Sequence, residues 1–503
     1  MRGTTNANYR FGETVGGGYV TVYPIQDLTA NGNDGHINLS WSTPPASAVT
    51  TLSKIDIRYK AKTDSSTYFS SITDGTLAVS LTDTSTTSYT ITDVTAGQEY
   101  LVSVVAWGYV NEVGTSSLVP ATSAEQIVSA TPSAYKTWTV VIDESNSNPL
   151  SCCTYADDAA GMTKGSSDWD EIFGYKPCVF YQGAVYKYLN PNDFTKFADG
   201  TDATSYITDS NLLGYDVMIE FPRMGLTMSK SGTQVTISLT NNPNDSTFEY
   251  RAHKRGDTQK NAFYLGAYDA DDATVSGITS DTIGSVSGKS PLVARTLAQL
   301  IGYAHLRGTG YEIMAFYQWT YIQCLYVLKY GNLNSQASLG QGYVGGSRAR
   351  ATGTTNTKGM CYGSTSSSTD GVKLFGLENA WGNVYQWLGG LYTDPGYTLF
   401  TTTDNFGTNA SVTAWEYNVS SGVTAAITGY ISKVQGTNSG GFVVQQESGS
   451  ASTYFTDAGN LADGFPVVGG GWGDGGNAGV FYCYVYYSAS HSSEYFGSRL
   501  MYL

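Results

Sequence analysis

Residues 469–503 contain the side chains whose types give the clearest indication of function in the chain. These residue types are suited to binding a ligand rather than to catalysis. Six of the 39 tyrosines lie between positions 481 and 503, among glycine and serine residues. Tyrosine gives a large, rigid contact area at low entropic cost, and tyrosine, serine, glycine and asparagine are the residue types of paratopes. This segment therefore predicts a surface that binds a ligand.

The tyrosines alternate in a way that is typical of a strand over residues 479–487. Successive side chains of a strand point to opposite faces, so one face would carry Val480, Tyr482, Tyr484 and Tyr486. The other face would carry Phe481, Cys483, Val485 and Tyr487. Cysteine and valine suit a core, which leaves a row of tyrosines facing outward. The alternative is that these tyrosines pack under a loop or at a subunit interface.

Residues that could perform catalysis are sparse. The chain has four histidines, His36, His253, His305 and His491, and no HExxH, GxSxG or Walker sequence. The glycine run 469–471 opens no helix and so does not indicate a phosphate loop. The two carboxylates of a glycoside hydrolase can lie far apart in the sequence and come together only when the chain folds. Nothing in this sequence indicates such a pair. We expect no enzymatic activity, no catalytic residue and no cofactor.

Cysteines and acidic turns do not indicate a metal site either. The six cysteines include the adjacent pair Cys152 and Cys153 but no CxxC pair, which predicts a reduced protein with buried thiols. The acidic stretches 157–158 and 168–170 lack the spacing of a calcium loop, so we expect solvated turns there.

Composition excludes several classes of partner. The chain of 503 residues has 42 acidic and 27 basic side chains, a net charge of −15 and a pI near 4.6. Nucleic acids and anionic membrane surfaces need clustered lysine and arginine. No apolar stretch reaches the roughly 18 residues of a membrane span, and the N-terminus lacks the apolar core of a signal peptide, so we expect no membrane insertion.

The first part of the chain is divided into a lead and a β-sandwich. Residues 1–22 are predicted to be a flexible or attachment segment. Residues 23–130 show short alternating strands separated by turn residues, which predicts an all-β, immunoglobulin-like sandwich. Trp41, Tyr59 and the run 94–100, Val-Thr-Ala-Gly-Gln-Glu-Tyr, resemble fibronectin type III domains. That resemblance implies a spacer or adhesion module.

The rest is predicted to be a connecting region followed by one larger α+β domain. Residues 131–210 are read as the β-rich connection, with a strand at 138–142. Residues 211–503 carry predicted strands at 216–221, 234–239 and 263–268, two amphipathic helices and long loops. The first helix starts near Pro291, with Leu297, Leu300, Ile301 and Ala304 on one face, and the second spans about 311–330.

The stretch 376–387, Gly-Leu-Glu-Asn-Ala-Trp-Gly-Asn-Val-Tyr-Gln-Trp, resembles a signature of the formylglycine-generating-enzyme branch of the C-type lectin fold. We expect Gly382 to allow a tight turn, Asn383 to bind loop backbone and Trp387 to anchor a strand. The resemblance implies a C-type lectin-like fold for residues 211–503. An oxidase of that branch would need a cysteine pair, but Asp474 stands at the first thiol's place and Cys483 remains alone.

Residues 469–503 also closely resemble the variable region of diversity-generating-retroelement target proteins, especially phage receptor-binding proteins. In that family adenines are randomised, most often in an asparagine codon, which can yield Tyr, Ser, His, Asp, Gly or Phe. Glu494 cannot arise from an asparagine codon in this way. Nine other positions hold residues that can: Gly471, Gly473, Asp474, Tyr484, Tyr486, Tyr487, His491, Ser493 and Tyr495. With Asn477 and Phe496 these form the expected ligand-binding set.

This resemblance implies a receptor-binding protein of a phage tail tip or tail fibre, made in the bacterial cytoplasm and displayed on the virion. It implies a host-cell surface receptor, protein or glycan, a homotrimer, and attachment to other tail proteins through the N-terminal region. Two alternatives remain at this point. One is a bacterial surface adhesin or calcium-dependent lectin of the same fold, and the other is a formylglycine-generating-enzyme-like oxidase.

Overall fold

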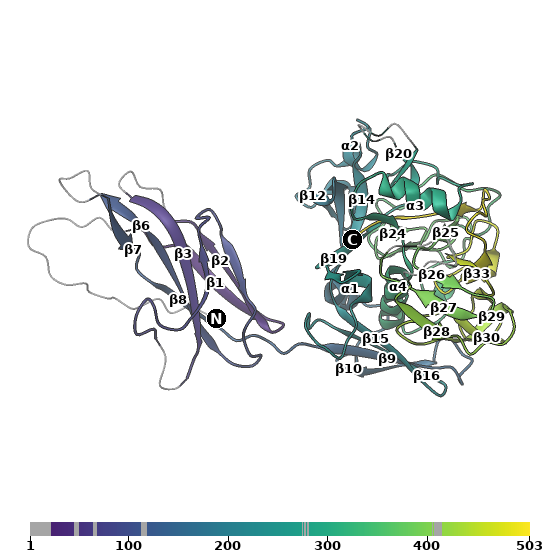
Figure 1. The fold of residues 1–503 in the computed structure, drawn as a ribbon, viewed down its shortest axis with the longest axis horizontal. Coiled ribbons are helices and arrows are strands. Elements are labelled where there is room, and N and C mark those ends of the chain that lie inside the picture. The colour runs from purple at the N-terminus through teal and green to yellow at the C-terminus, as the bar shows by residue number, and fades with distance from the viewer. Residues whose placement is uncertain are drawn as a thin grey trace, which may run out of the picture. The chain divides into compact units, whose positions relative to one another are not determined.

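The computed structural model describes residues 22–44, 50–63, 68–111, 118–273, 275, 278, 281–404, 406 and 415–503. Nearly all of the predicted lead, residues 1–22, therefore lies outside the described residues. The chain divides into two compact units, Met1–Lys136 and Thr137–Leu503. Most described elements of both units are strands, and all the described helices belong to the second unit (Figure 1). The described residues contain no helix that is long and apolar enough to span a membrane.

The first unit is an all-β sandwich, as its alternating sequence predicts. Among its described residues, β1, β2 and β5 pair in one antiparallel sheet, and β3, β4, β6, β7 and β8 pair in another. The strands are β1 (Gln26–Asn33), β2 (His36–Ser42), β3 (Thr50–Ala61), β4 (Thr76–Leu81), β5 (Ser88–Ile91), β6 (Tyr100–Asn111), β7 (Leu118–Thr122) and β8 (Gln126–Ala130).

Aromatic residues anchor this sandwich where the sequence places them. Trp41 and Tyr59 are buried between the sheets, and Tyr59 packs against Tyr100 with ring centroids 5.9 Å apart. The Tyr100 hydroxyl accepts a hydrogen bond from the Thr95 backbone N–H at 2.9 Å. Such a bond from a strand tyrosine to the backbone a few residues upstream is the tyrosine corner of immunoglobulin-like sandwiches. Gly97, at φ +79°, permits the turn between them.

The second unit is built on a large antiparallel sheet, a large mixed sheet and a smaller antiparallel one. The smaller sheet has the order β10 (Cys153–Asp157), β9 (Thr137–Asp143), β16 (Gln234–Thr240), β15 (Gly225–Ser231). The first large sheet has the order β13 (Asp193–Phe197), β12 (Ala184–Asn190), β11 (Lys176–Tyr181), β14 (Asp216–Pro222), β19 (Ala262–Gly266), β35 (Leu500–Tyr502), β22 (Tyr311–Ile313).

The second large sheet contains the C-terminal tyrosine segment. Its order is β30 (Val444–Glu447), β29 (Ile427–Val434), β31 (Ala458–Leu461), β33 (Cys483–Tyr487), β32 (Phe465–Val468), β25 (Tyr385–Trp387), β34 (Phe496–Gly497). In Figure 1 the label β33 lies in the yellow C-terminal part of the chain, close to β29 and β30. Shorter sheets complete the unit: β26 (Leu391–Thr393), β27 (Thr398–Thr401) and β28 (Tyr417–Ser420), and the pairs β17 (Lys254–Arg255) with β18 (Thr258–Gln259), β20 (Asp271–Ala273) with β21 (Thr282–Gly284), and β23 (Lys373–Leu374) with β24 (Leu377–Glu378).

The region 131–210 is not a separate connection, which corrects the predicted boundary at residue 211. Strand β9 pairs along its whole length with β16, and β11 pairs with β14. Both pairings join residues before 211 to residues after it in one core. The acidic stretch 168–170 is also not a turn, because it begins helix α1 (Asp168–Phe173), which buries Trp169.

Helices α3 and α4 occupy the two predicted helical regions but differ in extent. Helix α3 (Leu297–His305) begins after Thr296 rather than near Pro291, because Thr296 and Gln299 form a reciprocal capping box. Helix α4 (Phe316–Tyr330) begins five residues later than predicted, since residues 311–313 form strand β22. The other described helices are α2 (Thr204–Ile207), α5 (Ser335–Ser338) and the 3-10 turns η1 (Arg251–His253) and η2 (Gly475–Asn477).

Helix α4 is a central helix rather than an amphipathic surface helix. Every residue from Phe316 to Lys329 is buried. Its polar side chains are paired in the interior: Gln318 donates to the Ala252 carbonyl at 2.6 Å, and Gln323 donates to the Val480 carbonyl at 2.9 Å. Burying a polar side chain costs little free energy when the side chain forms such a hydrogen bond. The polar residues of α4 therefore do not indicate a face exposed to solvent.

Candidate binding surface

Strand β33 lies inside its sheet and thereby fixes the orientation of the C-terminal tyrosines. It pairs in parallel with β31 and antiparallel with β32, so its backbone is held on both sides. Cys483 and Val485 are buried in the core of the unit, as predicted. Tyr484 is half-buried on the opposite face, and Tyr486 is 41% exposed. The alternation therefore separates a core face from an accessible face.

The strand is shorter than the predicted 479–487, and this changes the role of Tyr482. Residues 479–482 precede the strand in a turn, and Tyr482 is fully buried. Its ring stacks on that of Tyr484, with centroids 4.5 Å apart and planes 18° apart. Tyr482 is thus a buried support for Tyr484 and not part of an outward-facing row.

Tyr484, Tyr486, Tyr487 and His491 form one continuous aromatic group, which we call the tyrosine surface. Neighbouring ring centroids lie 5.9, 4.0 and 4.8 Å apart along this series. The Tyr486 hydroxyl donates a hydrogen bond to the Tyr487 hydroxyl at 2.6 Å. Burial raises the pKa of Tyr484 and Tyr487, so both phenols remain neutral and can donate or accept hydrogen bonds. Contact between the rings limits their rotamers before any ligand binds.

A second part of the surface is the loop 471–477 together with Tyr495. Trp472 stacks on Tyr495 with centroids 4.6 Å apart and planes 19° apart. The Asp474 carboxylate accepts hydrogen bonds from the Gly471 backbone N–H at 2.6 Å and from the Tyr385 hydroxyl at 2.8 Å. Burial raises the pKa of Asp474. Asp474 therefore holds the loop to the sheet as well as lining the surface.

The structure places most of the predicted binding residues at or near the surface. Gly473 and Tyr486 are exposed, and seven are partly exposed: Asp474, Asn477, Tyr484, Tyr487, His491, Ser493 and Tyr495. Gly471 is buried, and the side chains of Tyr385 and Asp474 lie next to it. Phe496, in β34, is also buried, because its ring packs against the rings of Trp387 and Tyr487. It is therefore a scaffold residue and not a contact residue.

Glycines of this segment fall into two groups that differ in how much room a side chain would have. A Cβ atom added at Gly473 would meet nothing within 4 Å, and one at Gly471 would make an ordinary 3.5 Å contact with Tyr385. Both positions belong to the randomisable set. In contrast, a Cβ at Gly479 would lie 2.2 Å from the Asp457 carboxylate, and Gly470 adopts φ +77°. Gly479 and Gly470 lie outside that set.

This difference gives a first prediction about stability. Gly473→Ser is expected to change the free energy of unfolding by no more than about 0.5 kcal/mol, as for an open surface position. Gly479→Ala is expected to cost about 1–3 kcal/mol, because the buried Asp457 side chain must move while it accepts a hydrogen bond from Phe481 N–H at 2.8 Å. Denaturant unfolding of both variants measures the two values. Equal stabilities would contradict the division into two groups.

Beneath the surface, Arg499 links the predicted 376–387 motif to the C-terminal segment. Its fully buried guanidinium donates to the Gln386 side chain at 3.0 Å and to the carbonyls of Gly266 and Glu378 at 2.8 and 2.7 Å. It also faces the Asp269 carboxylate at 3.3 Å. Every described contact partner of this group is buried, so Arg499 acts as a structural cross-link.

The motif itself behaves as its residues predict. Gly382 adopts φ +78°, Trp387 is fully buried, and Asn383 accepts a hydrogen bond from the Arg350 backbone N–H at 2.9 Å. The Asn383 amide donates to Asp269 at 2.8 Å, as does the Asn379 amide at 2.9 Å. Burial raises the pKa of Asp269 to about 6 in spite of Arg499. The motif thus builds a polar scaffold under the binding segment.

Sequence reasoning missed the contribution of Tyr385. Its ring lies between those of Tyr482, 5.6 Å away, and Tyr495, 6.4 Å away, and it joins the tyrosine surface to the 471–477 loop. Tyr385 is almost 100 residues before these partners in the chain. Its signal was its place in the 376–387 motif, where it is the partly exposed residue directly before the buried Gln386 and Trp387.

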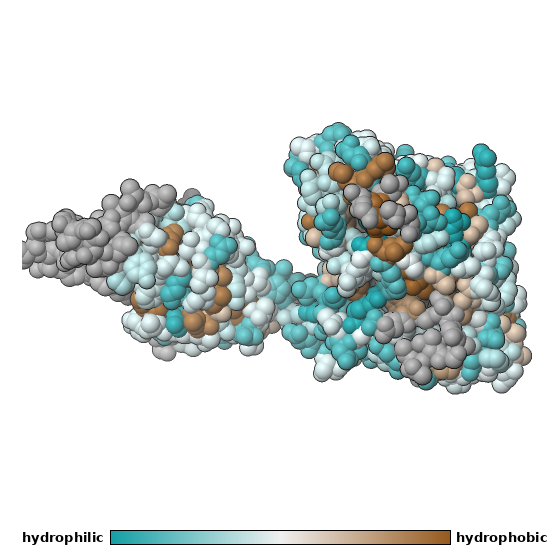
Figure 2. Space-filling model, turned by 45° about the horizontal axis from the view of Figure 1, so that its top comes forward, coloured by the Kyte–Doolittle hydropathy of each residue, from teal (hydrophilic) through white to brown (hydrophobic). Residues whose placement is uncertain are grey.

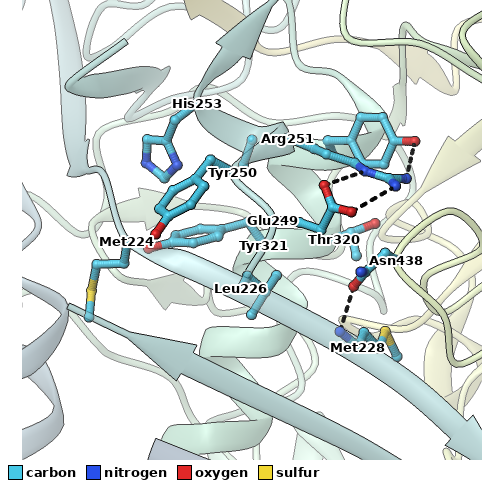
Figure 3. Close-up of a pocket in the computed structure, with 12 residues that line it drawn as sticks. Met224, Leu226, Met228, Glu249, Tyr250, Arg251, His253, Thr320, Tyr321 and Asn438 are labelled. Atoms are coloured by element: carbon cyan, nitrogen blue, oxygen red, sulfur yellow. Dashed lines mark hydrogen bonds and ion pairs between the residues drawn. The ribbon is translucent and has the colours of Figure 1, made fainter. Parts of the chain in front are cut away.

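Another feature of the described part of the second unit is a small interior cavity. A cavity of about 30 Å³ is lined by residues that include Met224, Tyr250, His253, Thr320 and Tyr321 (Figure 3). It has room for about two water molecules and not for a substrate. Burial lowers the pKa of His253 to about 3, so this histidine is neutral. No group of three or more potential metal ligands occurs among the described residues.

A polar cluster at the end of α3 contains a histidine and a glutamate in direct contact, as in a general acid–base pair. His305 forms a hydrogen bond with Glu312 at 2.5 Å, which raises the pKa of the histidine. Arg255 donates to Glu312 and to Asp404, each at 2.7 Å. Each charged group of the cluster is paired with an opposite charge, so the cluster is an ion-pair network, and such networks also shift pKa values.

Comparison with known proteins identifies the first unit. A family model described as fibronectin type III domain matches residues 23–122. Residues 23–122 are a fibronectin type III domain. The sandwich topology and the tyrosine corner of the fibronectin type III domain agree with this match, which confirms the resemblance predicted from Trp41, Tyr59 and the 94–100 run.

Comparisons of the whole chain add little. A search of curated proteins finds no match. A solved structure titled "Titin kinase and its flanking domains" aligns at 12% identity with a TM-score of 0.14, covering 75% of this chain and 53% of that chain. The chain therefore spans about half the length of that protein chain, and the likeness carries no argument about the second unit.

Proposed function

We propose that this chain is a receptor-binding protein of a phage tail tip or tail fibre, and that its C-terminal segment is a diversified surface that binds a host-cell molecule. The observation that carries the proposal is the tyrosine surface. Tyr484, Tyr486 and Tyr487 stand on a strand fixed within its sheet, His491 packs against Tyr487, and all four side chains are at least partly exposed. Rigid tyrosines on a fixed scaffold make an effective paratope.

The glycine positions support diversification of this surface. A segment that tolerates many side chains needs variable positions with room for a Cβ and fixed positions that maintain the backbone. Gly473 and Gly471 have that room, whereas Gly479 and Gly470 do not. The resemblance to retroelement target proteins places Gly471 and Gly473 in the randomisable set, and Gly470 and Gly479 are not in that set.

Several further properties belong to the same proposal. The second unit would have a C-type lectin-like fold, supported by its 376–387 scaffold motif, its few helices and its long loops. The fibronectin type III domain would act as a spacer, and the N-terminal region would attach the chain to other tail proteins. A homotrimer would present several copies of a weak site and gain avidity. The chain would be made in the bacterial cytoplasm and act on the virion.

The neighbouring DNA tests the diversification directly. We expect a reverse-transcriptase gene and a near-copy of the 3′ end of this gene that differs at adenines. Those differences should fall in the codons for 471, 473, 474, 484, 486, 487, 491, 493 and 495. A near-copy whose differences fall equally on Gly479, Phe481 and Arg499 would contradict the proposal, and so would the absence of any near-copy.

A further inference from the structure

An open hollow lies in the second unit beside the residues already described. It has a volume of about 560 Å³ and is lined by Ser290, Tyr343, Arg348, Ala349, Arg350 and Ala351. Ligand sites commonly have volumes of about 300–1,000 Å³. None of these residues belongs to the predicted binding set, and they come from two separate segments of the chain.

Hydrogen bonds place the hollow next to the 471–477 loop. On one side, the Gly346 N–H donates to the Trp472 carbonyl at 2.8 Å, and the Gly475 N–H donates to the Val344 carbonyl at 3.1 Å. On the other side, the Ala294 N–H donates to the Ser493 carbonyl at 3.0 Å. Both lining segments are therefore fixed against the segment that carries the stacked Trp472 and Tyr495.

The lining is positively charged in an acidic protein. Arg348 is exposed, and no ion pair joins it to any described residue. The Arg350 guanidinium lies 4.5 Å from the Tyr343 ring centroid and donates to the Thr369 carbonyl and the Thr354 hydroxyl. None of the described residues that line the hollow carries a carboxylate, although the chain has a net charge of −15.

Two acidic residues that directly follow hydrogen-bond partners of these segments do not neutralise this charge. Asp370 follows the Thr369 carbonyl that Arg350 contacts, and Glu494 follows Ser493. Both are exposed, and neither forms an ion pair with Arg348 or Arg350 among the described residues. Arginine presents several N–H donors in a planar fork that fits a carboxylate or a phosphate.

We infer that this hollow is an anion-binding subsite of the recognition surface, and that the receptor is an acidic cell-surface carbohydrate. Arg348 and Arg350 would bind the carboxylate or phosphate of one sugar, while the Trp472–Tyr495 stack packs against the apolar face of a neighbouring sugar. The inference rests on the proposed function, since it names the class of ligand for that surface. Binding at an exposed arginine would weaken as salt rises.

Ligand-observed NMR titration of the full-length chain tests the subsite. Glucuronic acid supplies a carboxylate, glucose 6-phosphate supplies a phosphate, and glucose is the neutral probe. We expect at least one acidic sugar to bind at least 10-fold more tightly than glucose, and the sugar that binds identifies the anion. Arg348→Ala should weaken that binding at least 10-fold, and Arg348→Lys should weaken it less. Lys176→Ala removes an exposed charge elsewhere in the unit and should have no effect.

Two results would overturn the inference: equal binding of glucose and both acidic sugars, or an Arg348→Ala variant that binds like the unmodified chain. Because Arg348 is exposed, unfolding temperatures of the variants should agree, which excludes a folding defect. Loss of host-cell binding on mutation of Tyr486 with no effect of Arg348→Ala on acidic-sugar binding would refute the subsite alone. The opposite pair of results would refute the tyrosine surface and leave the subsite in place.

Discussion

Replacing Tyr484 and Tyr486 together with alanine is expected to abolish the binding of the full-length chain to host cells. Truncating a tyrosine hot spot costs about 2 kcal/mol or more of binding free energy, which is roughly 30-fold in affinity for each residue. Tyr486 is 41% exposed and Tyr484 is half-buried, so neither ring fills the core beneath β33. Flow cytometry of the labelled chain on host cells measures the loss.

Tyr109 provides a matched control for this experiment. It is 42% exposed on β6 of the fibronectin type III domain, almost the same as Tyr486. Tyr109→Ala should leave host-cell binding unchanged. Unaltered binding by the double variant, or a loss of more than about 3 kcal/mol in its stability, would show that the two tyrosines serve the fold instead.

Tyr487 is left out of the double variant because the structure gives it a second role. Its ring packs edge-on against Phe496 at 4.8 Å and lies 6.1 Å from Trp387. Tyr487→Ala would therefore lower both binding and stability, and its effect on adsorption could not be assigned to contact with the receptor.

The second large effect is expected from Arg499→Ala, which should destabilise the second unit by about 3–5 kcal/mol. Removing one partner of a buried charge pair leaves the other charge uncompensated. In this variant Asp269 would keep its two amide donors but lose the only guanidinium near it among the described residues. Three backbone carbonyls and the Gln386 side chain would also each lose one hydrogen bond.

Denaturant unfolding followed by tryptophan fluorescence measures this loss. The fibronectin type III domain has its own core and should unfold as before. Arg295→Ala is a suitable control, because this partly buried arginine contacts only the neighbouring carbonyls of Val293 and Ala294 among the described residues. It should cost less than about 1 kcal/mol. A similarly small cost for Arg499→Ala would contradict its role as a cross-link.

Much of the local structure could be predicted because alternation of apolar residues is a short-range signal. The strands at 138–142, 216–221 and 234–239 appear as β9, β14 and β16, since their apolar side chains alternate or run continuously into a core. The fibronectin type III domain was recognisable because Trp41 and the 94–100 corner are local features.

Long-range pairing could not be predicted in the same way. Residues 137–143 have no local sign that they will pair with 234–240, so region 131–210 looked like a connection. The polar residues of α4 suggested a solvent face, because the sequence does not reveal that Gln323 will meet the Val480 carbonyl. Tertiary partners overrode the local pattern in both cases.

The candidate site shows the same limit. The alternation of the C-terminal segment predicted that Tyr484 and Tyr486 lie on the accessible face of the strand. It also predicted that Cys483, one residue before Tyr484, points into the core. Phe496 was misassigned because its neighbours Trp387 and Tyr487 converge only in the folded sheet. Arg348 could not be linked to the surface at all, since the hydrogen bond from Gly346 to Trp472 spans more than 100 residues.

The most direct test of the central claim is photo-crosslinking of the full-length chain to intact host cells. A photoreactive phenylalanine analogue is introduced at Tyr486 in one protein and at Tyr109 in another, two positions with 41% and 42% exposure. We expect a covalent adduct with a host-cell surface molecule from position 486 and none from position 109. Adducts from position 109 alone, or from neither position while the chain still binds the cells, would contradict it.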